Sequence, residues 1–236
     1  MNNDIKSVWN KHWAKGINEE LSYEERRRLE ILQKWAGDFK GKKWLEIGAG
    51  SGRTAFYLAK CGASVTVYEI SKVSIELIHK NAERKGVRIE IIESDITKPI
   101  DRDIGRYDVV YSAGVIEHFV DTDIAVQNMS KLVCQNGLLI CFAPQSYSYW
   151  TVIKRRKMKE GEWFGGWETN FSAWELRRLF SVDKTLRFKY WGGFNLLLLP
   201  YDFYNSRFRR FYAWTDRIPL LNLFGKEIGV CFQKVK

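Results

Sequence analysis

The sequence predicts an α/β fold built on a mainly parallel β-sheet, and three observations support this. Short apolar runs alternate with segments of helical character between residues 42 and 143. A glycine-rich turn, GAGSG, directly follows the first apolar run. Serines stand just before several helical segments, where they can cap the helix. Parallel strands joined by right-handed helical crossovers account for this alternation.

The elements of the first 143 residues follow from these patterns. Residues 4–15 are expected to be a helix with Trp9 and Trp13 on one face, and a capping box of Ser22 and Glu25 opens a second helix. Five apolar segments are the expected strands, namely residues 42–47, 64–69, 87–92, 107–112 and 137–143. The helices expected between them are residues 53–61, from Ser71 to Gly86, and from Asp121 to about Cys134.

The alternation ends after the fifth strand. Residues 145–170 form a long insertion that contains the basic run KRRKMK, and Ser172 and Glu175 form another capping box. Two further strands are expected, at residues 185–191 and 227–235. The tract between them, about residues 192–226, is long for a plain connection and is expected to contain helical structure.

The composition bounds the class of protein. The 236 residues are enough for one domain with a lid. The polar N-terminus has no apolar signal core, and the longest apolar run falls far short of the roughly 20 residues of a spanning helix. The four cysteines lie far apart without a CxxC pair, which is typical of buried thiols in a reducing compartment. We therefore expect a cytoplasmic protein, with peripheral contact at the inner membrane surface left open.

The net charge of +10 is distributed unevenly. Residues 1–143 carry 21 basic and 20 acidic side chains, whereas residues 144–236 carry 17 basic and 8 acidic ones, together with 22 of the 35 aromatic residues. Aromatic residues beside Lys/Arg clusters suit contact with anionic lipid or with the phosphates and bases of a nucleic acid. They also suit a lid core with solvated charges, and the composition leaves these three interpretations open.

The glycine-rich turn is the strongest functional signal. Its glycines let the chain turn tightly and let a ligand approach the main chain. Glu69 ends the next strand, 21 residues after Gly48, where an acid can accept hydrogen bonds from ribose hydroxyls. A dinucleotide fingerprint would have a further glycine in place of Arg53, and Glu46 suits an ammonium or sulfonium group better than a phosphate. The implied ligand carries an adenosine and a positive end, without a pyrophosphate.

Several segments occur in an order that identifies a family resemblance. LEIGAGSG, VYEIS, ESDI, YDVVYSAGVIEHF and LVCQNGLLICFAPQ follow one another between about residues 42 and 145. In this order they resemble the motifs of the class I S-adenosylmethionine-dependent methyltransferases. The resemblance implies a Rossmann-like, doubly wound seven-stranded sheet with its last strand antiparallel, together with helical lid segments.

The resemblance also implies S-adenosyl-L-methionine as the cofactor and assigns residues to it. Gly48, Gly50 and the adjacent main chain would line the methionine and ribose portions, Glu69 would hold the ribose hydroxyls, and Asp95 would meet the adenine amino group. Ser112 and its neighbour would lie under the sulfonium. The full expected set is Glu46, Gly48, Ala49, Gly50, Gly52, Glu69, Ile70, Asp95, Ile96, Ser112 and Ala113.

The expected catalytic residues follow the fourth strand. Methyl transfer depends mainly on alignment, and a base is needed only for a hydroxyl or a protonated amine. His118 is the candidate base because an unperturbed imidazole titrates near pH 6.5, and Glu117 precedes it. The alternative is that this Glu-His pair is structural and only shapes the cofactor pocket.

The same segment argues against a metal role for the Glu-His pair and against methylation of nucleobase amino groups. The O-methyltransferases of ubiquinone synthesis resemble it, but they carry an extra acid three residues before the Glu-His pair, which completes a divalent metal site. Gly114 stands at that position, so we expect no metal ion. Methyltransferases that act on nucleobase amino groups usually show a [DNS]PP[YFW] motif where this chain has SAGV.

We therefore expect an enzyme that methylates a hydroxyl of a small-molecule, sugar or lipid-linked acceptor. An RNA-directed methyltransferase and a non-catalytic S-adenosylmethionine-binding protein are the alternatives. The expected organisation is an N-terminal helical cap over residues 1–40 and a methyltransferase domain over residues 41–236, with lid insertions at about residues 145–170 and 192–226.

Overall fold

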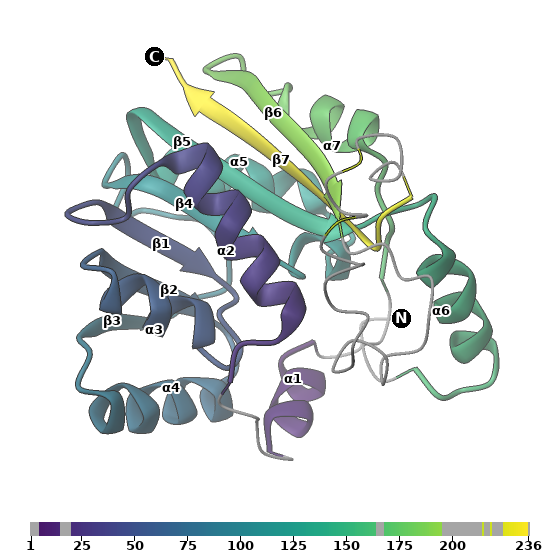
Figure 1. Cartoon of the computed structure of the whole chain (residues 1–236), viewed down its shortest axis with the longest axis horizontal. Helices are drawn as coiled ribbons and strands as arrows, with labels where there is room; N and C mark the ends of the chain where they lie inside the picture. The colour runs from purple at the N-terminus through teal and green to yellow at the C-terminus, as the bar shows by residue number, and fades with distance from the viewer. Residues whose placement is uncertain are drawn as a thin grey trace.

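A seven-stranded β-sheet forms the centre of the structure (Figure 1). The computed structural model describes residues 5–14, 20–163, 168–194, 214, 218 and 224–235. The strands are β1 (Lys43–Ile47), β2 (Ser64–Glu69), β3 (Ile89–Glu93), β4 (Tyr107–Ala113), β5 (Val133–Pro144), β6 (Leu186–Phe194) and β7 (Glu227–Lys234). The helices are α1 (Ile5–Trp13), α2 (Tyr23–Ala36), α3 (Arg53–Lys60), α4 (Lys72–Lys85), the 3-10 turn η1 (Ile116–His118), α5 (Thr122–Leu132), α6 (Tyr149–Lys159) and α7 (Ala173–Phe180).

The strand order is that of a doubly wound sheet. It runs β3-β2-β1-β4-β5-β7-β6. The first five strands pair in parallel, and β7 is antiparallel to both of its neighbours. The predicted seven-stranded sheet with its last strand antiparallel is therefore confirmed. Because the order reverses beside β1, the carboxyl ends of β1 and β4 form the crevice in which ligands bind in such sheets.

Helices cover both faces of the sheet, and each face has its own apolar core. On one face, Leu32 of α2 and Phe56 of α3 pack with Trp44, which is fully buried. On the other face, Met129 of α5 and Phe180 of α7 pack in a second cluster. The central strands are buried on both sides, which explains why they are apolar runs rather than alternating sequences.

The predicted capping boxes are present. The Ser22 side chain accepts a hydrogen bond from the Glu25 amide, and the Glu25 carboxylate accepts one from the Ser22 amide. Ser172 and Glu175 form the same reciprocal pair at the start of α7. Asp121 also stands at a helix start, as expected, but its side chain makes no capping hydrogen bond.

The fifth strand begins earlier than predicted, at Val133 instead of residue 137. Asn136 takes the left-handed conformation (φ 65°), which is typical of a turn residue. A Cβ at Gly137 would lie 2.8 Å from a Val133 methyl group and 2.9 Å from the Asp108 carbonyl oxygen. The glycine therefore permits close packing of two chain segments, and the turn is made by its neighbour.

The predicted insertion after β5 contains α6, which lies at one side of the molecule and does not cover the sheet (Figure 1). Most of the second predicted lid, residues 192–226, lies outside the described residues. Within the described part of the chain, no helix has the length and apolar character needed to cross a bilayer.

Candidate active site

A cavity of about 330 Å³ opens at the carboxyl ends of β1, β2 and β4. This volume is at the lower end of the range of pockets that hold small molecules and cofactors. Its walls come from the glycine-rich turn after β1, from the ends of the next strands, and from α1 and α2. The predicted site residues that line it are Glu46, Gly48, Ala49, Gly50, Glu69, Ile70, Asp95, Ile96, Ala113 and His118.

The glycine-rich turn keeps the floor of the cavity free of side chains. Gly48 and Gly50 have φ values of 67° and 53°, a conformation that side chains disfavour. A Cβ at Gly50 would lie 2.4 Å from the Trp13 ring, and one at Gly48 would lie 2.5 Å from a Val115 methyl group. Any larger residue at either position would therefore displace a wall of the cavity.

Glu69 joins the end of β2 to this turn. One carboxylate oxygen accepts a hydrogen bond from the Gly50 amide at 2.9 Å. The other oxygen accepts from the amides of Ile70 and Ser71 at 2.8 and 2.9 Å. The side chain is buried at the cavity wall. These bonds fix a carboxylate where the resemblance expects the acceptor of ribose hydroxyls.

Glu46 is a buried carboxyl group at the end of β1 that also lines the cavity. Burial, together with the negative charge of Glu25, raises its pKa to about 8, while Arg28 acts against the shift. Its Oε2 atom has no hydrogen-bond partner among the described residues. A buried polar atom left in this way is the expected state of a group whose partner is a ligand.

Asp95 and Ile96 line the cavity in the loop after β3. The Asp95 carboxylate caps its own turn, because it accepts hydrogen bonds from the amide and the hydroxyl of Thr97 at 3.0 and 2.7 Å. This pairing orients the side chain at the cavity without using all of its acceptor capacity.

Three predicted site residues are not among the described residues that line the cavity. Gly52 is the N-cap of α3, and a Cβ there would meet Phe56. Ser112 is fully buried within β4. Glu117 is buried close to Gly114, whereas its neighbour His118 lines the cavity. The roles predicted for these three residues remain predictions.

Glu117 resembles Glu46 electrostatically but not in position. Burial raises its pKa to about 8, with a further contribution from Glu168. Its Oε2 atom also has no hydrogen-bond partner in the part of the chain that the structure describes. Both carboxyl groups are therefore mostly protonated at pH 7, and of the two only Glu46 is among the described residues that line the cavity.

Helix α1, which belongs to the predicted N-terminal cap, supplies much of the outer wall, but sequence reasoning assigned none of its residues to the site. Trp9, His12 and Trp13 all line the cavity. The Trp9 ring packs edge-on against His118, with 5.1 Å between centroids, and stacks on Trp13 at 6.2 Å. The spacing of the two tryptophans indicated that they share a helical face. It did not indicate which surface that face contacts, because the contact is made with residues distant in the sequence.

Helix α2 adds a second wall that motif analysis did not identify. Glu25 and Arg28 line the cavity. Arg28 donates two hydrogen bonds to Glu227 at 2.9 and 2.7 Å, which ties α2 to the start of β7. Arg53 of α3 pairs with Glu25 at 2.9 Å. The site thus combines a bare turn, buried carboxyl groups, an aromatic wall and one imidazole.

Comparisons with known proteins agree with this geometry. Residues 45–141 match the family described as "Methyltransferase domain". The "Ubiquinone biosynthesis O-methyltransferase" of Erwinia tasmaniensis is 31% identical over 110 residues, which cover 47% of this chain and 45% of that protein. The chain thus spans about half the length of the curated relatives that it matches.

Solved structures show the same fold over the whole chain. A putative sarcosine dimethylglycine methyltransferase from Galdieria sulphuraria is 18% identical, with a TM-score of 0.67 and 98% of each chain covered. The N-methyltransferase NodS from Bradyrhizobium japonicum, solved with S-adenosyl-l-homocysteine, is 14% identical, with a TM-score of 0.66, 99% of this chain and 100% of that chain covered. The glycine-rich turn, the strand order and the matched segment agree, so residues 45–141 of this chain are similar to the methyltransferase-domain family.

Proposed function

We propose that the protein is an S-adenosylmethionine-dependent methyltransferase that acts on a hydroxyl group of a small-molecule or lipid-linked acceptor. The observation that carries the proposal is the pair Glu46 and Glu69, two buried carboxyl groups that line one cavity together with the glycine turn. The relatives named for ubiquinone biosynthesis support a small-molecule acceptor.

The residues of the cavity fit this cofactor. Glu69 would accept hydrogen bonds from the ribose hydroxyls, and the unpartnered oxygen of Glu46 would face the positively charged methionine portion. Asp95 and Ile96 would hold the adenine. A pyrophosphate would fit poorly, because its negative charges would meet a carboxyl group at the turn.

When bound, the cofactor supplies an electrophilic methyl group on a sulfonium. His118 would take the hydroxyl proton as the acceptor oxygen receives the methyl group and the cofactor leaves as a neutral thioether. Since little new charge develops, the protein contributes mainly by alignment. Helix α1 contributes by covering the cavity and excluding water.

The test combines calorimetry with a transfer assay. We expect S-adenosylmethionine to bind, and its labelled methyl group to be transferred to a member of a panel of phenols, catechols and lipid-linked sugars. His118→Gln is expected to slow that transfer by about 100-fold or more, because a general base is lost. His79→Gln, on the exposed face of α4, is the matched control and should leave the rate unchanged.

The outcomes separate the alternatives. Absence of binding would reject the proposal, and binding without transfer to any acceptor would favour the non-catalytic alternative. An unchanged rate in His118→Gln would remove this residue from the mechanism.

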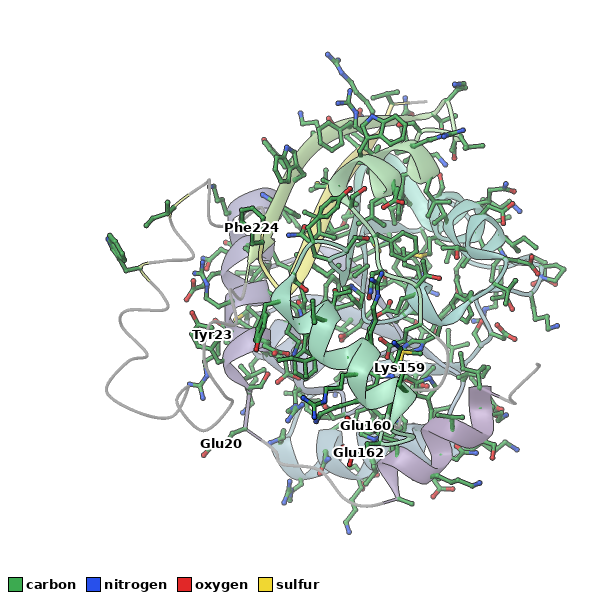
Figure 2. The ribbon with its side chains drawn as sticks, turned by 90° about the vertical axis from the view of Figure 1, so that its right-hand side faces the viewer. Glu20, Tyr23, Lys159, Glu160, Glu162 and Phe224 are labelled. Carbon is green, nitrogen blue, oxygen red and sulfur yellow. The ribbon has the colours of Figure 1, made fainter. Side chains whose placement is uncertain are left out.

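We further propose peripheral contact with an anionic membrane through α6. Its outer side exposes Tyr149 and Val152, which are 61% and 62% accessible. Arg155, Arg156 and Lys159 are exposed on the same helix, and the label at Lys159 marks its end in Figure 2. Exposed apolar side chains beside basic ones suit insertion at a lipid headgroup surface.

Sedimentation with vesicles tests this contact. The protein should sediment with phosphatidylglycerol-containing vesicles more than with pure phosphatidylcholine, and Val152→Glu should abolish the difference. The control is Val182→Glu, a similarly exposed valine that follows α7. Equal sedimentation with both vesicles, or competition by transfer RNA without any lipid dependence, would overturn the proposal.

A further inference from the structure

A buried ion pair lies beside the imidazole of His118. Lys154 of α6 is almost fully buried, and its ammonium group donates a hydrogen bond to Glu168 Oε2 at 2.8 Å and another to Asn170. The other oxygen of the same carboxylate, Oε1, lies 4.0 Å from His118 Nε2. The side chains of Glu168 and His118 are only 9% and 5% exposed.

The backbone holds this arrangement in place. The Thr169 amide donates a hydrogen bond to the Glu117 carbonyl oxygen at 2.8 Å, which ties the segment after α6 to η1. Gln145 and Phe171 form a further bridge at the base of the insertion. Since a fully buried lysine and its carboxylate cost desolvation energy, the pair is a weak source of stability compared with apolar packing. A role in orienting a neighbouring group accounts for its position better.

We propose that Glu168, held by Lys154, is a positioning residue for His118. This inference rests on the proposed function. The carboxylate lies 4.0 Å from Nε2, so it favours a proton on that nitrogen and orients the imidazole for proton transfer. It also stabilises the imidazolium that exists once the proton has moved. A distance of 4.0 Å is long for a hydrogen bond, but such contacts commonly tighten when ligands bind.

The proton balance is complete within the site. One proton leaves the acceptor oxygen and arrives on the His118 imidazole, which becomes an imidazolium beside the Glu168 carboxylate. Release of the proton to water restores the neutral imidazole after the product departs. The insertion at residues 145–170 thus contributes the charged pair of Lys154 and Glu168, which acts on the imidazole of the active site.

Several charged groups surround the imidazole and set its titration. Glu168 and Lys154 act with opposite signs, and Glu117 is mostly protonated near pH 7 because burial raises its pKa to about 8. The titratable groups that line the cavity beside His118 are His12, Glu25, Arg28, Glu46, Arg53, Tyr68, Glu69, Asp95 and Tyr111. Glu168 is not among these lining residues, and its carboxylate lies 4.0 Å from His118 Nε2.

Nuclear magnetic resonance of the imidazoles provides the test without any acceptor. The chain has three histidines, so His118→Gln assigns the resonance. We expect Glu168→Gln to lower the pKa of His118 by about one unit, because a neighbouring negative charge favours the protonated form. Glu160→Gln is the matched control. It removes the exposed carboxylate that follows α6 (Figure 2) and pairs with Arg156, and it should leave the pKa of His118 unchanged.

A second variant keeps the test valid if Glu168→Gln does not fold around the buried ammonium group. Glu168→Asp keeps the charge but withdraws the carboxylate by one methylene, and a smaller decrease in the pKa of His118 is expected. An unchanged pKa in the folded Glu168 variants would overturn the inference. S-adenosylmethionine affinity is measured on the same variants and on the unaltered protein. If the unaltered protein does not bind S-adenosylmethionine, the proposed function is rejected, whatever the pKa of His118 shows.

Discussion

Replacing Glu69 by alanine is expected to weaken S-adenosylmethionine binding by about 100-fold or more. Two ribose hydroxyls would lose a charged acceptor, and hydrogen bonds to charged groups contribute about 1.5–3 kcal/mol each. The same substitution removes the acceptor of the Gly50, Ile70 and Ser71 amides, so the glycine turn also loses its support. Calorimetric titration measures the combined loss.

The matched control for this substitution is Glu90→Ala. Glu90 lies on the neighbouring strand β3 and pairs with Thr66 and Arg106, away from the cavity. Circular dichroism confirms that both variants are folded, and Glu69→Gln, which keeps the shape of the side chain, should fall between alanine and glutamate. Unchanged affinity in Glu69→Ala would show that the ribose assignment is wrong.

Local sequence patterns predicted the elements that build the floor of the site. The strand Ser64–Glu69 matches its prediction residue for residue, because its β-branched run ends where Ser71 caps the next helix. The capping boxes also define helix starts through contacts three residues apart. Since the glycine turn and Glu69 belong to such local patterns, the sequence was sufficient to bring them together once the strands were assumed parallel.

The remaining walls depend on contacts between distant segments, which local patterns do not specify. The basic run KRRKMK was expected to lie at a surface, yet its first lysine, Lys154, is buried against a carboxylate 14 residues away. Trp13 lies on Gly50, and Arg28 bonds to Glu227, which is 199 residues distant. No periodicity in the chain indicates these pairs, because they arise only when the insertion and the N-terminal helices pack on the finished sheet.

Raising the pH from about 6 to about 8 is expected to tighten S-adenosylmethionine binding, up to tenfold per pH unit. The pKa of Glu46 in the free protein is raised to about 8 by burial, so the group is protonated below that pH. A cationic ligand favours the ionised carboxylate, and binding in this range must therefore release a proton. The released proton is measured by calorimetry in two buffers with different ionisation enthalpies.

Glu46→Gln should remove both the pH dependence and the proton release, whereas Glu117→Gln should preserve them. The two variants can be compared directly because burial raises the pKa of both carboxyl groups to about 8. Only Glu46 of the two is among the described residues that line the cavity. If titration of any buried carboxyl group produced the effect, the two variants would behave alike. An undiminished pH slope in Glu46→Gln would show that the cationic end of the ligand does not meet this side chain, and the orientation proposed for the cofactor would have to be reversed.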